Sequence, residues 1–237
     1  MRQAFILSAG LGTRLRPLTD KLPKPLIPVQ GKPLIAHIIA QLKSLGIEQA
    51  AINTHHLASV WADYQEILEQ EGLELSYHYE PELLDSGGGI ANIAHELAQA
   101  GQIKPSDNIL IYNGDIWTDI DLKALIDAHD KSHEQSSHDV TLALRPEGEA
   151  LRIKMQKGSH TILDIANPQP DANLDEWYQF TGIYIANVEW LLSLPRGKHS
   201  VIPQWQELIG EQRVQGIVLD EGMWQDLGTL SAYNAVK

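Results

Sequence analysis

Glycines and a basic residue follow the first apolar run of this 237-residue chain in an order that suits phosphate binding. Residues 4–8 are expected to form a buried strand, after which the chain turns through Gly10 and Gly12 and reaches Arg14. Glycines let the backbone approach a ligand closely and point N–H groups at it. A guanidinium matches phosphate oxygens in a bidentate fork. The order of these residues therefore indicates a polyphosphate site.

This glycine pattern differs from the two common nucleotide-binding loops. It lacks the Gly-Lys-Ser/Thr ending of a P-loop, and Arg14 and Leu15 stand where a dinucleotide-binding Rossmann loop ends in its third glycine. The acid expected about 20 residues further on is also absent. A Rossmann-type reductase is therefore a weaker alternative, which a binding screen with NAD(P) would test. The short Gly-x-Gly-Thr-Arg pattern by itself is also common in plain strand-to-helix turns.

The residues that follow make the pattern more specific. Lys24 stands among three prolines, which fix the backbone and can hold a lysine in place. Residues 7–35 as a whole resemble the N-terminal signature of the sugar-nucleotidyltransferase family, the nucleotide-sugar pyrophosphorylases. The resemblance implies catalytic roles for Arg14 and Lys24. It also implies nucleotide binding by a set of residues in this segment, namely Ser8, Ala9, Gly10, Gly12, Thr13, Arg14 and Lys24.

Two later segments match the nucleotide-binding part of the family. Residues 86–90 (Ser-Gly-Gly-Gly-Ile) stand at a strand-to-helix entry, and in the family the backbone of the first glycine, here Gly87, lies beside the base. A helix start that packs closely also needs small residues, so the two roles can coexist. Glu80, at the end of the preceding strand, matches the family position that contacts the base.

Two carboxylates match the metal ligands of the family. Asp115, in Asn113-Gly114-Asp115, follows a core strand, and ligands bind at the carboxyl ends of strands in open α/β sheets. A lone aspartate there is often only a turn or helix cap, as we expect for Asp119. The resemblance implies that Asp115 and Asp226 are catalytic and hold Mg²⁺, which commonly takes few protein ligands and completes its shell with phosphate and water.

The sugar pocket is expected to include Asn113 and Gly182, because residues 181–184 match the segment that lines it in the family, although an ordinary core strand would also fit this pattern. Many thymidylyl- and uridylyltransferases carry a Glu-Lys-Pro just before this region, where the lysine reaches the sugar phosphate. Residues 163–168 of this chain contain no lysine. More of the phosphate binding is therefore expected to fall to Lys24 and the metal.

The order of the apolar segments predicts an α/β fold with a Rossmann-like, doubly wound, mostly parallel sheet and an antiparallel sugar-pocket region. Strands are expected at residues 4–8, 49–53, 73–79 and 108–112, with helices at 33–45, 60–69, 87–98 and 122–129. Later strands are expected at 140–144, 151–156, 160–164, 178–186 and 215–219, with helices near 188–194 and 203–210. We expect one domain over 1–237, with a nucleotide-binding part (1–138) and a sugar-binding part (139–237).

Composition excludes several classes of protein and site. The chain contains no cysteine, so disulfides, thiolate zinc sites and cysteine nucleophiles are excluded. The net charge of −13 argues against general binding to nucleic acids or acidic membranes. Residues 1–32 nevertheless hold six basic residues against Asp20 alone, a local balance of +5 that suits an anion site. No apolar run approaches the roughly 18 residues of a membrane span, and a cytoplasmic protein is expected.

The implied reaction joins an NTP and a sugar 1-phosphate to give an NDP-sugar and pyrophosphate. The second pKa of a phosphate monoester is about 6, so the acceptor is already mostly anionic at neutral pH and needs no general base. Catalysis must then come from positioning and charge neutralisation. Lys24 is expected to hold the attacking phosphate, and Arg14 is expected to balance the charge that develops on pyrophosphate.

Within the family, the short chain and the motifs at residues 85–89 and 113–119 are most similar to the N-acetylmuramate 1-phosphate uridylyltransferases of bacterial peptidoglycan recycling. UTP and N-acetylmuramate 1-phosphate are thus the expected substrates of a monomer or small homo-oligomer. The alternatives are a mannose-1-phosphate guanylyltransferase, a glucose-1-phosphate thymidylyl- or uridylyltransferase, and a nucleotide-sugar sensor without catalysis. Mg²⁺-dependent release of pyrophosphate would distinguish an enzyme from a sensor.

Overall fold

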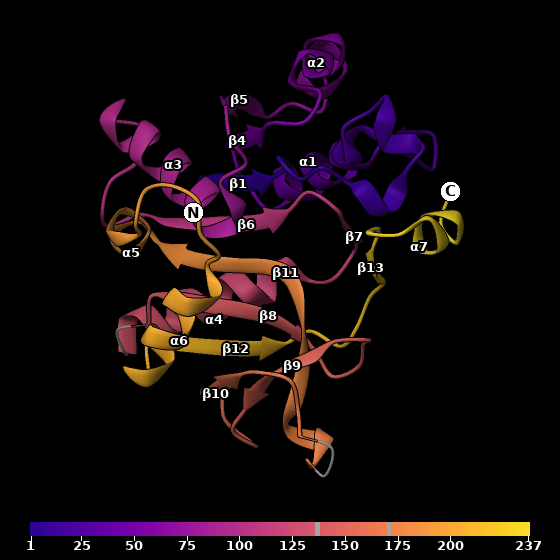
Figure 1. Cartoon of the computed structure of the whole chain (residues 1–237). Coiled ribbons are helices and arrows are strands. Elements are labelled where there is room, and N and C mark those ends of the chain that lie inside the picture. Colours follow the sequence, from indigo (N-terminus) through magenta and orange to yellow (C-terminus); the bar gives the residue numbers. More distant parts are fainter. Residues whose placement is uncertain (136–137, 170–171) are drawn as a thin grey trace.

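The predicted parallel strands form the centre of the sheet. We describe the protein from a computed structural model, which covers residues 1–135, 138–169 and 172–237. Strand β1 (Gln3–Leu7) lies between β4 (Gln49–Thr54) and β6 (Asn108–Asn113) and is parallel to both (Figure 1). Strand β5 (Glu74–Tyr79) continues the parallel order beyond β4. Because these strands are parallel, their carboxyl ends meet at one edge of the sheet.

The predicted antiparallel region completes the same sheet. The long strand β11 (Trp177–Asn187) runs antiparallel to β6 and joins the two halves. On its other side β11 pairs with β8 (Val140–Arg145). The first residues of β11 pair with β9 (Leu151–Met155), which lies on the same side of β11 as β6. Within the described ranges nine strands belong to this sheet. The remaining members are β8 (Val140–Arg145), β9 (Leu151–Met155), β10 (Ile162–Ile165) and β12 (Val214–Val218).

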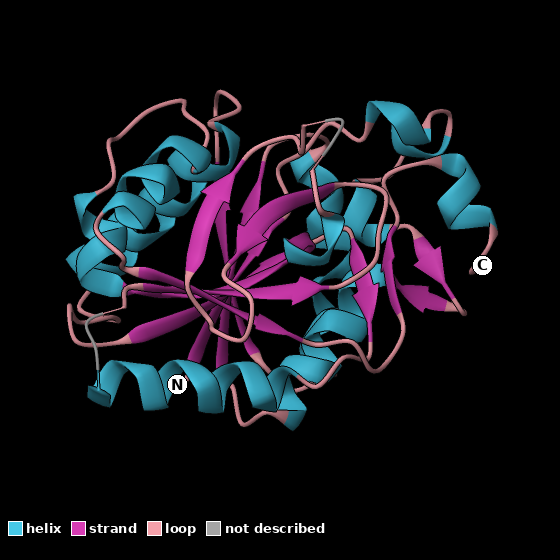
Figure 2. Cartoon of the chain, turned by 90° about the horizontal axis from the view of Figure 1, so that it is seen from below, coloured by secondary structure: helices cyan, strands magenta, loops and turns pink. Residues whose placement is uncertain are grey.

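Helices cover both faces of the sheet, which confirms the doubly wound α/β fold (Figure 2). One face packs against α1 (Leu34–Ser44), α2 (Trp61–Glu69) and α4 (Leu122–Gln135). The other face packs against α3 (Asp85–Gln99), α5 (Val188–Ser193) and α6 (Ile202–Gly210). The main elements agree with the sequence-based expectation to within a few residues, except that α4 extends beyond the expected residues 122–129 as far as Gln135.

The segment between β1 and α1 (residues 8–33), which we call the N-terminal loop, packs against the C-terminal end of the chain. The sequence did not predict this contact. The loop contains three short 3₁₀ turns and the small ribbon β2 (Pro28–Val29) and β3 (Lys32–Pro33). It shares a small apolar core with the segment around α7 (Leu230–Asn234), and the two lie side by side in indigo and yellow in Figure 1. The Tyr233 hydroxyl donates a hydrogen bond of 2.9 Å to the Pro28 carbonyl.

A second unpredicted ribbon closes the same side of the molecule. Strand β7 (Ile116–Thr118) pairs antiparallel with β13 (Trp224–Asp226), and Asp226 lies directly opposite Ile116. The indole Nε1–H of Trp224 donates to the Thr181 carbonyl at 2.8 Å and ties the ribbon to β11. The ribbon therefore carries a C-terminal carboxylate to the end of β6.

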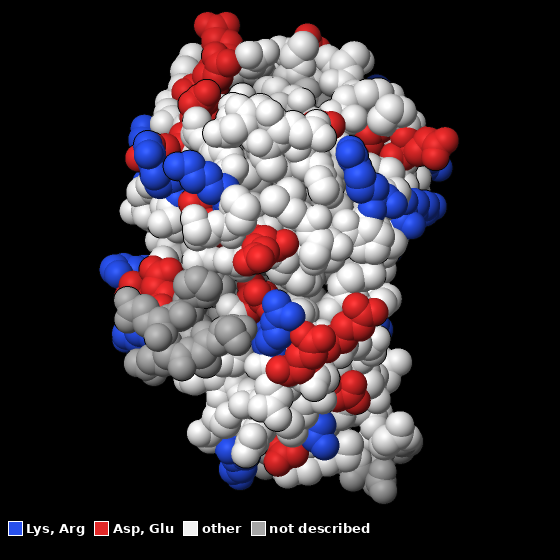
Figure 3. All heavy atoms as spheres, turned by 90° about the vertical axis from the view of Figure 1, so that its left-hand side faces the viewer, with Lys and Arg blue, Asp and Glu red and all other residues white. Residues whose placement is uncertain are grey.

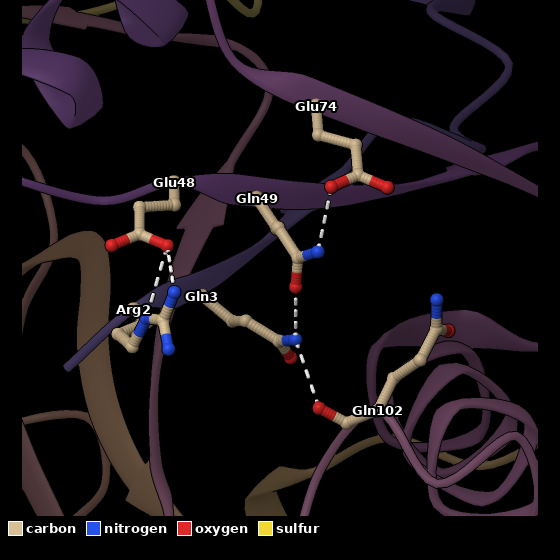
Figure 4. A network of polar contacts seen from close by, with 6 residues as sticks. All are labelled: Arg2, Gln3, Glu48, Gln49, Glu74 and Gln102. Carbon is tan, nitrogen blue, oxygen red and sulfur yellow. Dashed lines mark hydrogen bonds and ion pairs between the residues drawn. The ribbon is translucent and has the colours of Figure 1, made fainter.

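Polar side chains at the amino ends of the parallel strands form hydrogen bonds with one another. Gln3 Nε2 donates to Gln49 Oε1 at 2.5 Å, and Gln49 Nε2 donates to Glu74 Oε2 at 2.7 Å, so these side chains connect β1, β4 and β5 (Figure 4). Arg2 forms an ion pair with Glu48 beside them (Figure 4). On the face at the left of Figure 1, acidic and basic side chains are interspersed rather than gathered into one basic patch (Figure 3).

Candidate functional site

A cavity of about 510 Å³ lies where the carboxyl ends of the four parallel strands meet. Ser8, Ala9 and Gly10 line it from the end of β1, and Asn113 and Asp115 line it from the end of β6. Open α/β sheets bind ligands at this edge, and the predicted position of the site agrees with it. The structure therefore brings the glycine-rich turn after β1 and the Asn-Gly-Asp motif after β6, which lie about 100 residues apart, to one cavity that is large enough for a substrate.

Lys24 joins the two predicted metal-binding carboxylates at one end of this cavity. Its Nζ lies 2.5 Å from Asp115 Oδ2 and 3.8 Å from Asp226 Oδ1. The lysine side chain is only 11% exposed, so its ammonium is held rather than freely solvated. In such a cluster a metal ion can bind the two carboxylates, and the ammonium of Lys24 can then bind a phosphate oxygen instead.

The electrostatics of the cluster favour additional positive charge. Burial raises the pKa of Asp226 above its ordinary value, and the charge of Asp115 raises it further. Lys24, a backbone N–H of Gly228 and Arg14 act in the opposite direction without cancelling the shift. The raised pKa means that the surroundings disfavour the ionised form of Asp226, and a bound divalent cation would offset this effect.

Gly228 provides the space in which Arg14 and Asp226 meet. A Cβ placed on Gly228 would lie 2.8 Å from Arg14 Nη2 and 2.9 Å from Asp226 Oδ1. Any larger residue would push one of these groups away. Arg14, Lys24, Asp115 and Asp226 are therefore brought together as predicted, although Arg14 and Asp226 adjoin the cavity rather than line it. Gly228 is a further residue of the candidate site, two positions after Asp226, for which the sequence predicted no role.

The turn of the N-terminal loop is fixed from beneath. Gly12 has a φ of +60°, which glycine adopts without strain, and a Cβ on it would lie 2.7 Å from Thr19 Cγ2. The Thr19 hydroxyl donates to the Gly12 carbonyl at 2.8 Å, and His56 Nε2 lies 2.7 Å from the Thr19 carbonyl. Thr13 begins the 3₁₀ turn that follows and does not line the cavity. Thr19 and His56 thus position the loop, a role that no local sequence signal indicated.

Glu80 lines the cavity but its carboxylate is occupied within the protein. Its side chain is buried, accepts from Asn53 Nδ2 at 2.7 Å and accepts from the Leu84 backbone N–H at 2.9 Å. Asn53 Oδ1 in turn accepts from the Ser8 backbone N–H at 2.6 Å. This chain of hydrogen bonds fixes the end of β1 relative to β5. The contact of Glu80 with a base remains a prediction.

Two glycines predicted to contact ligands, Gly87 beside the base and Gly182 in the sugar pocket, are not among the residues that line this cavity. The Gly87 N–H already donates to the His199 carbonyl at 3.0 Å. Gly182 has a φ of +82°, and a Cβ there would lie 2.9 Å from Ile116 Cγ1 and 3.0 Å from Asn113 Nδ2. Gly182 therefore lets β11 approach Asn113, and the structure brings these two expected sugar-pocket residues together.

The basic N-terminal residues do not form one anion site. Lys24 contacts both carboxylates, and Arg14 lies near Asp226. By contrast, Arg2, Arg16 and Lys32 form ion pairs with Glu48, Asp20 and Glu71. Residues 163–168, where a second lysine was missing, lie around the edge strand β10 and do not line the cavity. The local charge of the sequence thus overstated the size of the anion site.

The chain matches the family described as nucleotidyl transferase over residues 3–237. The chain belongs to this family. The nucleotidyltransferase is 31% identical over 229 residues to the N-acetylmuramate alpha-1-phosphate uridylyltransferase of Caulobacter vibrioides, covering 95% of this chain and 91% of that protein. It is 32% identical over 231 residues to the enzyme of the same name from Neisseria meningitidis, covering 96% and 94%.

A third relative has a different substrate in its name. The mannose-1-phosphate guanylyltransferase of Mycobacterium tuberculosis is 29% identical over 232 residues, which are 95% of this nucleotidyltransferase but 61% of that protein. The fold is also that of HddC from Yersinia pseudotuberculosis (TM-score 0.77, 21% identity, covering 100% and 98% of the two chains). UDP-glucose pyrophosphorylase from Acinetobacter baumannii is similarly close in fold (TM-score 0.78, 17% identity, covering 99% and 92%).

The donor set of this nucleotidyltransferase limits how a metal could be held. Across residues 1–135, 138–169 and 172–237, no three His, Cys, Asp or Glu side chains gather as a complete metal site. The carboxylates of Asp115 and Asp226 both lie near Lys24 and supply oxygen donors. Mg²⁺ is commonly bound by one or two carboxylates together with substrate phosphates. The residues therefore fit Mg²⁺ that arrives with a nucleotide. In the same described ranges no helix is long and apolar enough to cross a membrane.

Proposed function

We propose that this protein transfers a uridylyl group from UTP to N-acetylmuramate 1-phosphate, releasing pyrophosphate, with Mg²⁺ as the cofactor. The observation that carries the proposal is the cluster of Lys24, Asp115 and Asp226 at the end of the cavity. In this proposal the two carboxylates hold Mg²⁺, which neutralises phosphate charge when bound. The setting of such a reaction is the cytoplasm and bacterial peptidoglycan recycling.

Each step assigned to this chain uses a residue near the cavity. A phosphate oxygen of the sugar 1-phosphate attacks the α-phosphorus of UTP, and the bond to the bridging oxygen of pyrophosphate breaks. The electron pair of that bond leaves with pyrophosphate, and no proton has to move because the acceptor phosphate is already anionic. Lys24 orients the acceptor, and Arg14 balances the growing charge on the leaving group.

The choice of substrates is supported by relatives of matching length. Both uridylyltransferases are covered over more than nine-tenths of their sequences, whereas the guanylyltransferase is covered over 61%. Mannose 1-phosphate with GTP remains the second candidate because that relative has nearly the same identity. Glucose 1-phosphate with UTP or dTTP is a third candidate.

The test is a panel of UTP, GTP, ATP and dTTP against N-acetylmuramate, mannose and glucose 1-phosphates, measured by pyrophosphate release. We expect the highest kcat/KM for UTP with N-acetylmuramate 1-phosphate, and loss of turnover when EDTA removes Mg²⁺. A preference for GTP with mannose 1-phosphate would assign the second candidate instead. Tight binding of a nucleotide sugar without pyrophosphate release from any pair would support the sensor.

A further inference from the structure

The loop between α5 and α6 is fastened to the start of α3 by its backbone. The His199 carbonyl accepts hydrogen bonds from the N–H groups of Gly87 at 3.0 Å and Gly88 at 3.1 Å. The Ser86 hydroxyl accepts from the Val201 N–H at 3.1 Å. In Figure 1 this loop passes beside the first turn of α3. The open N–H groups of a helix start are thus used to hold a loop that belongs to the other half of the chain.

The glycines of α3 make this close approach possible. A Cβ on Gly87 would lie 2.5 Å from the His199 ring, and a Cβ on Gly88 would lie 2.1 Å from the Gly197 carbonyl oxygen. Neither position has room for a side chain. The Gly-rich segment therefore acts as a docking surface for residues 197–200, which explains the glycines without any ligand.

Lys198 is the residue that this docked loop presents to the cavity. It lies between the two docked residues, Gly197 and His199, and lines the same cavity as Lys24. Its side chain is exposed, so its ammonium can reach a ligand in the opening. The next residue, His199, is held by backbone hydrogen bonds to Leu84, Gly87 and Gly88, which limits where the Lys198 ammonium can go.

The charge of the cavity wall gives Lys198 a specific task. Among the described lining residues three are acidic, namely Glu80, Asp85 and Asp115, and two are basic, namely Lys24 and Lys198. Lys24 is already balanced by two carboxylates. Lys198 is thus a second cation, besides Lys24, that can attract an anionic acceptor into this cavity.

We propose that Lys198 binds an anionic group of the acceptor sugar phosphate. The group is either the phosphate itself or the carboxylate of the lactyl ether that N-acetylmuramate carries. This inference rests on the proposed function, because it assumes a sugar 1-phosphate in the cavity. The nucleotide phosphates are left to the N-terminal loop, so Lys198 acts on the acceptor and not on the NTP.

The experiment compares Lys198→Ala with Lys198→Arg, and with Lys104→Ala as the matched control. Lys104 is also an exposed lysine on a cavity, but at the opposite edge of the sheet. We expect Lys198→Ala to raise KM for N-acetylmuramate 1-phosphate about 10- to 100-fold, as expected for a lost charged hydrogen bond. The KM for UTP should stay unchanged, Lys198→Arg should restore most of the affinity, and Lys104→Ala should behave as wild type.

N-Acetylglucosamine 1-phosphate distinguishes the two anionic groups, because it lacks only the lactyl ether. If Lys198→Ala weakens both sugars equally, the lysine binds the phosphate; if it weakens only the muramate, the lysine binds the carboxylate. An unchanged KM for both sugars, or a rise confined to UTP, overturns the proposal. So does an effect of Arg196→Ala that Lys198→Ala lacks, since Arg196 precedes the docked segment and does not line the cavity.

Calorimetric binding of each sugar 1-phosphate to wild type and variants keeps this test separate from the proposed function. If no pair of substrates is turned over by the wild type, the proposed reaction fails. The binding measurement then still decides whether Lys198 holds an anionic sugar. Circular dichroism and the Tm of each variant test whether the substitution leaves the fold intact.

Discussion

Asp226 lies opposite Ile116 in the β7–β13 ribbon, which brings its carboxylate to the same lysine as the carboxylate of Asp115. The two aspartates belong to distant parts of the chain, and the ribbon is the element that joins them. Because the ribbon is only three residues long on each side, its position depends on the packing of the C-terminal segment against the N-terminal loop. The candidate catalytic cluster is therefore assembled by the last elements of the chain.

Replacing Asp226 by alanine should lower turnover strongly while the protein stays folded. The side chain is 47% exposed, so its removal leaves no large cavity, but it removes one of two carboxylates proposed to hold Mg²⁺. We expect kcat to fall by about 10²- to 10³-fold, the range found when one group that stabilises developing charge is removed. The measurement is pyrophosphate release as Mg²⁺ is titrated. Asp220→Ala, at an exposed acid outside the cavity, is the matched control. Near-normal turnover of the Asp226 variant at saturating Mg²⁺ would show that the metal assignment is wrong.

Replacing Asp226 by asparagine should increase stability at neutral pH when no metal is present. The pKa of Asp226 is raised in the folded protein, so its protonated form is favoured there, and the folded state loses stability as the pH rises through that pKa. Asparagine cannot ionise and avoids this loss. The Tm of the variant should exceed that of wild type at pH 7 in EDTA, and the difference should shrink as the pH falls toward about 4, the ordinary range of an aspartate.

Mg²⁺ should reverse that order if the carboxylates bind it. A ligand that binds only the folded state raises the Tm, so Mg²⁺ with UTP should stabilise wild type more than Asp226→Asn. An equal Tm increase for both proteins would contradict metal binding at this residue. An equal Tm of both proteins in EDTA at pH 7 would contradict the unfavourable field around Asp226.

Gly88→Ala should displace the loop that carries Lys198. The new methyl group would lie 2.1 Å from the Gly197 carbonyl oxygen, so the loop backbone must move. Overpacking of this kind costs about 1–3 kcal/mol of the free energy of unfolding. Gly210→Ala, at the end of α6 with open space around its Cβ, is the matched control and should be neutral or slightly stabilising. Urea unfolding gives both values, and a wild-type stability of Gly88→Ala would contradict the docked loop.

Thr19→Val should weaken the N-terminal loop without changing its shape. Valine keeps the methyl group that packs beneath Gly12 but lacks the hydroxyl that donates to the Gly12 carbonyl. We expect a loss of about 1 kcal/mol of unfolding free energy, as for one buried hydrogen bond, and a higher KM for the NTP. Thr19→Ser keeps the donor and should preserve the KM. If both variants bind the NTP as wild type does, the hydrogen bond does not position the loop.

The fold could be predicted from the sequence because its signal is local. Apolar runs of strand length that alternate with amphipathic helices specify a doubly wound sheet, and parallel strands with helical connections leave few topologies. The carboxyl ends of such strands form one edge, so the positions of Ser8 and Asp115 at a common cavity followed from the order of the elements. Arg14 and Lys24 could also be identified from the sequence, because the glycines and prolines around them form local motifs.

Other parts of the site could not be predicted because they depend on contacts between distant segments. Nothing local in residues 224–226 indicates a strand, since a three-residue ribbon forms only when its partner is already in place. Glu80 matched a ligand position, yet its carboxylate is used by Asn53 and the Leu84 backbone. The glycines at 87 and 88 suggested a ligand, yet their empty space is filled by a loop from the far end of the chain.

The sequence by itself indicated the family and the sheet, and its resemblance to the family marked Arg14, Lys24, Asp115 and Asp226 as candidate site residues, because such motifs can be read along the chain. Only the tertiary structure decided that Asp226 shares Lys24 with Asp115, and that Lys198 faces the same cavity. Both decisions depend on the packing of the C-terminal half onto the carboxyl edge of the sheet. Such packing is fixed by the three-dimensional fit of buried side chains and backbone groups, which a linear pattern does not contain.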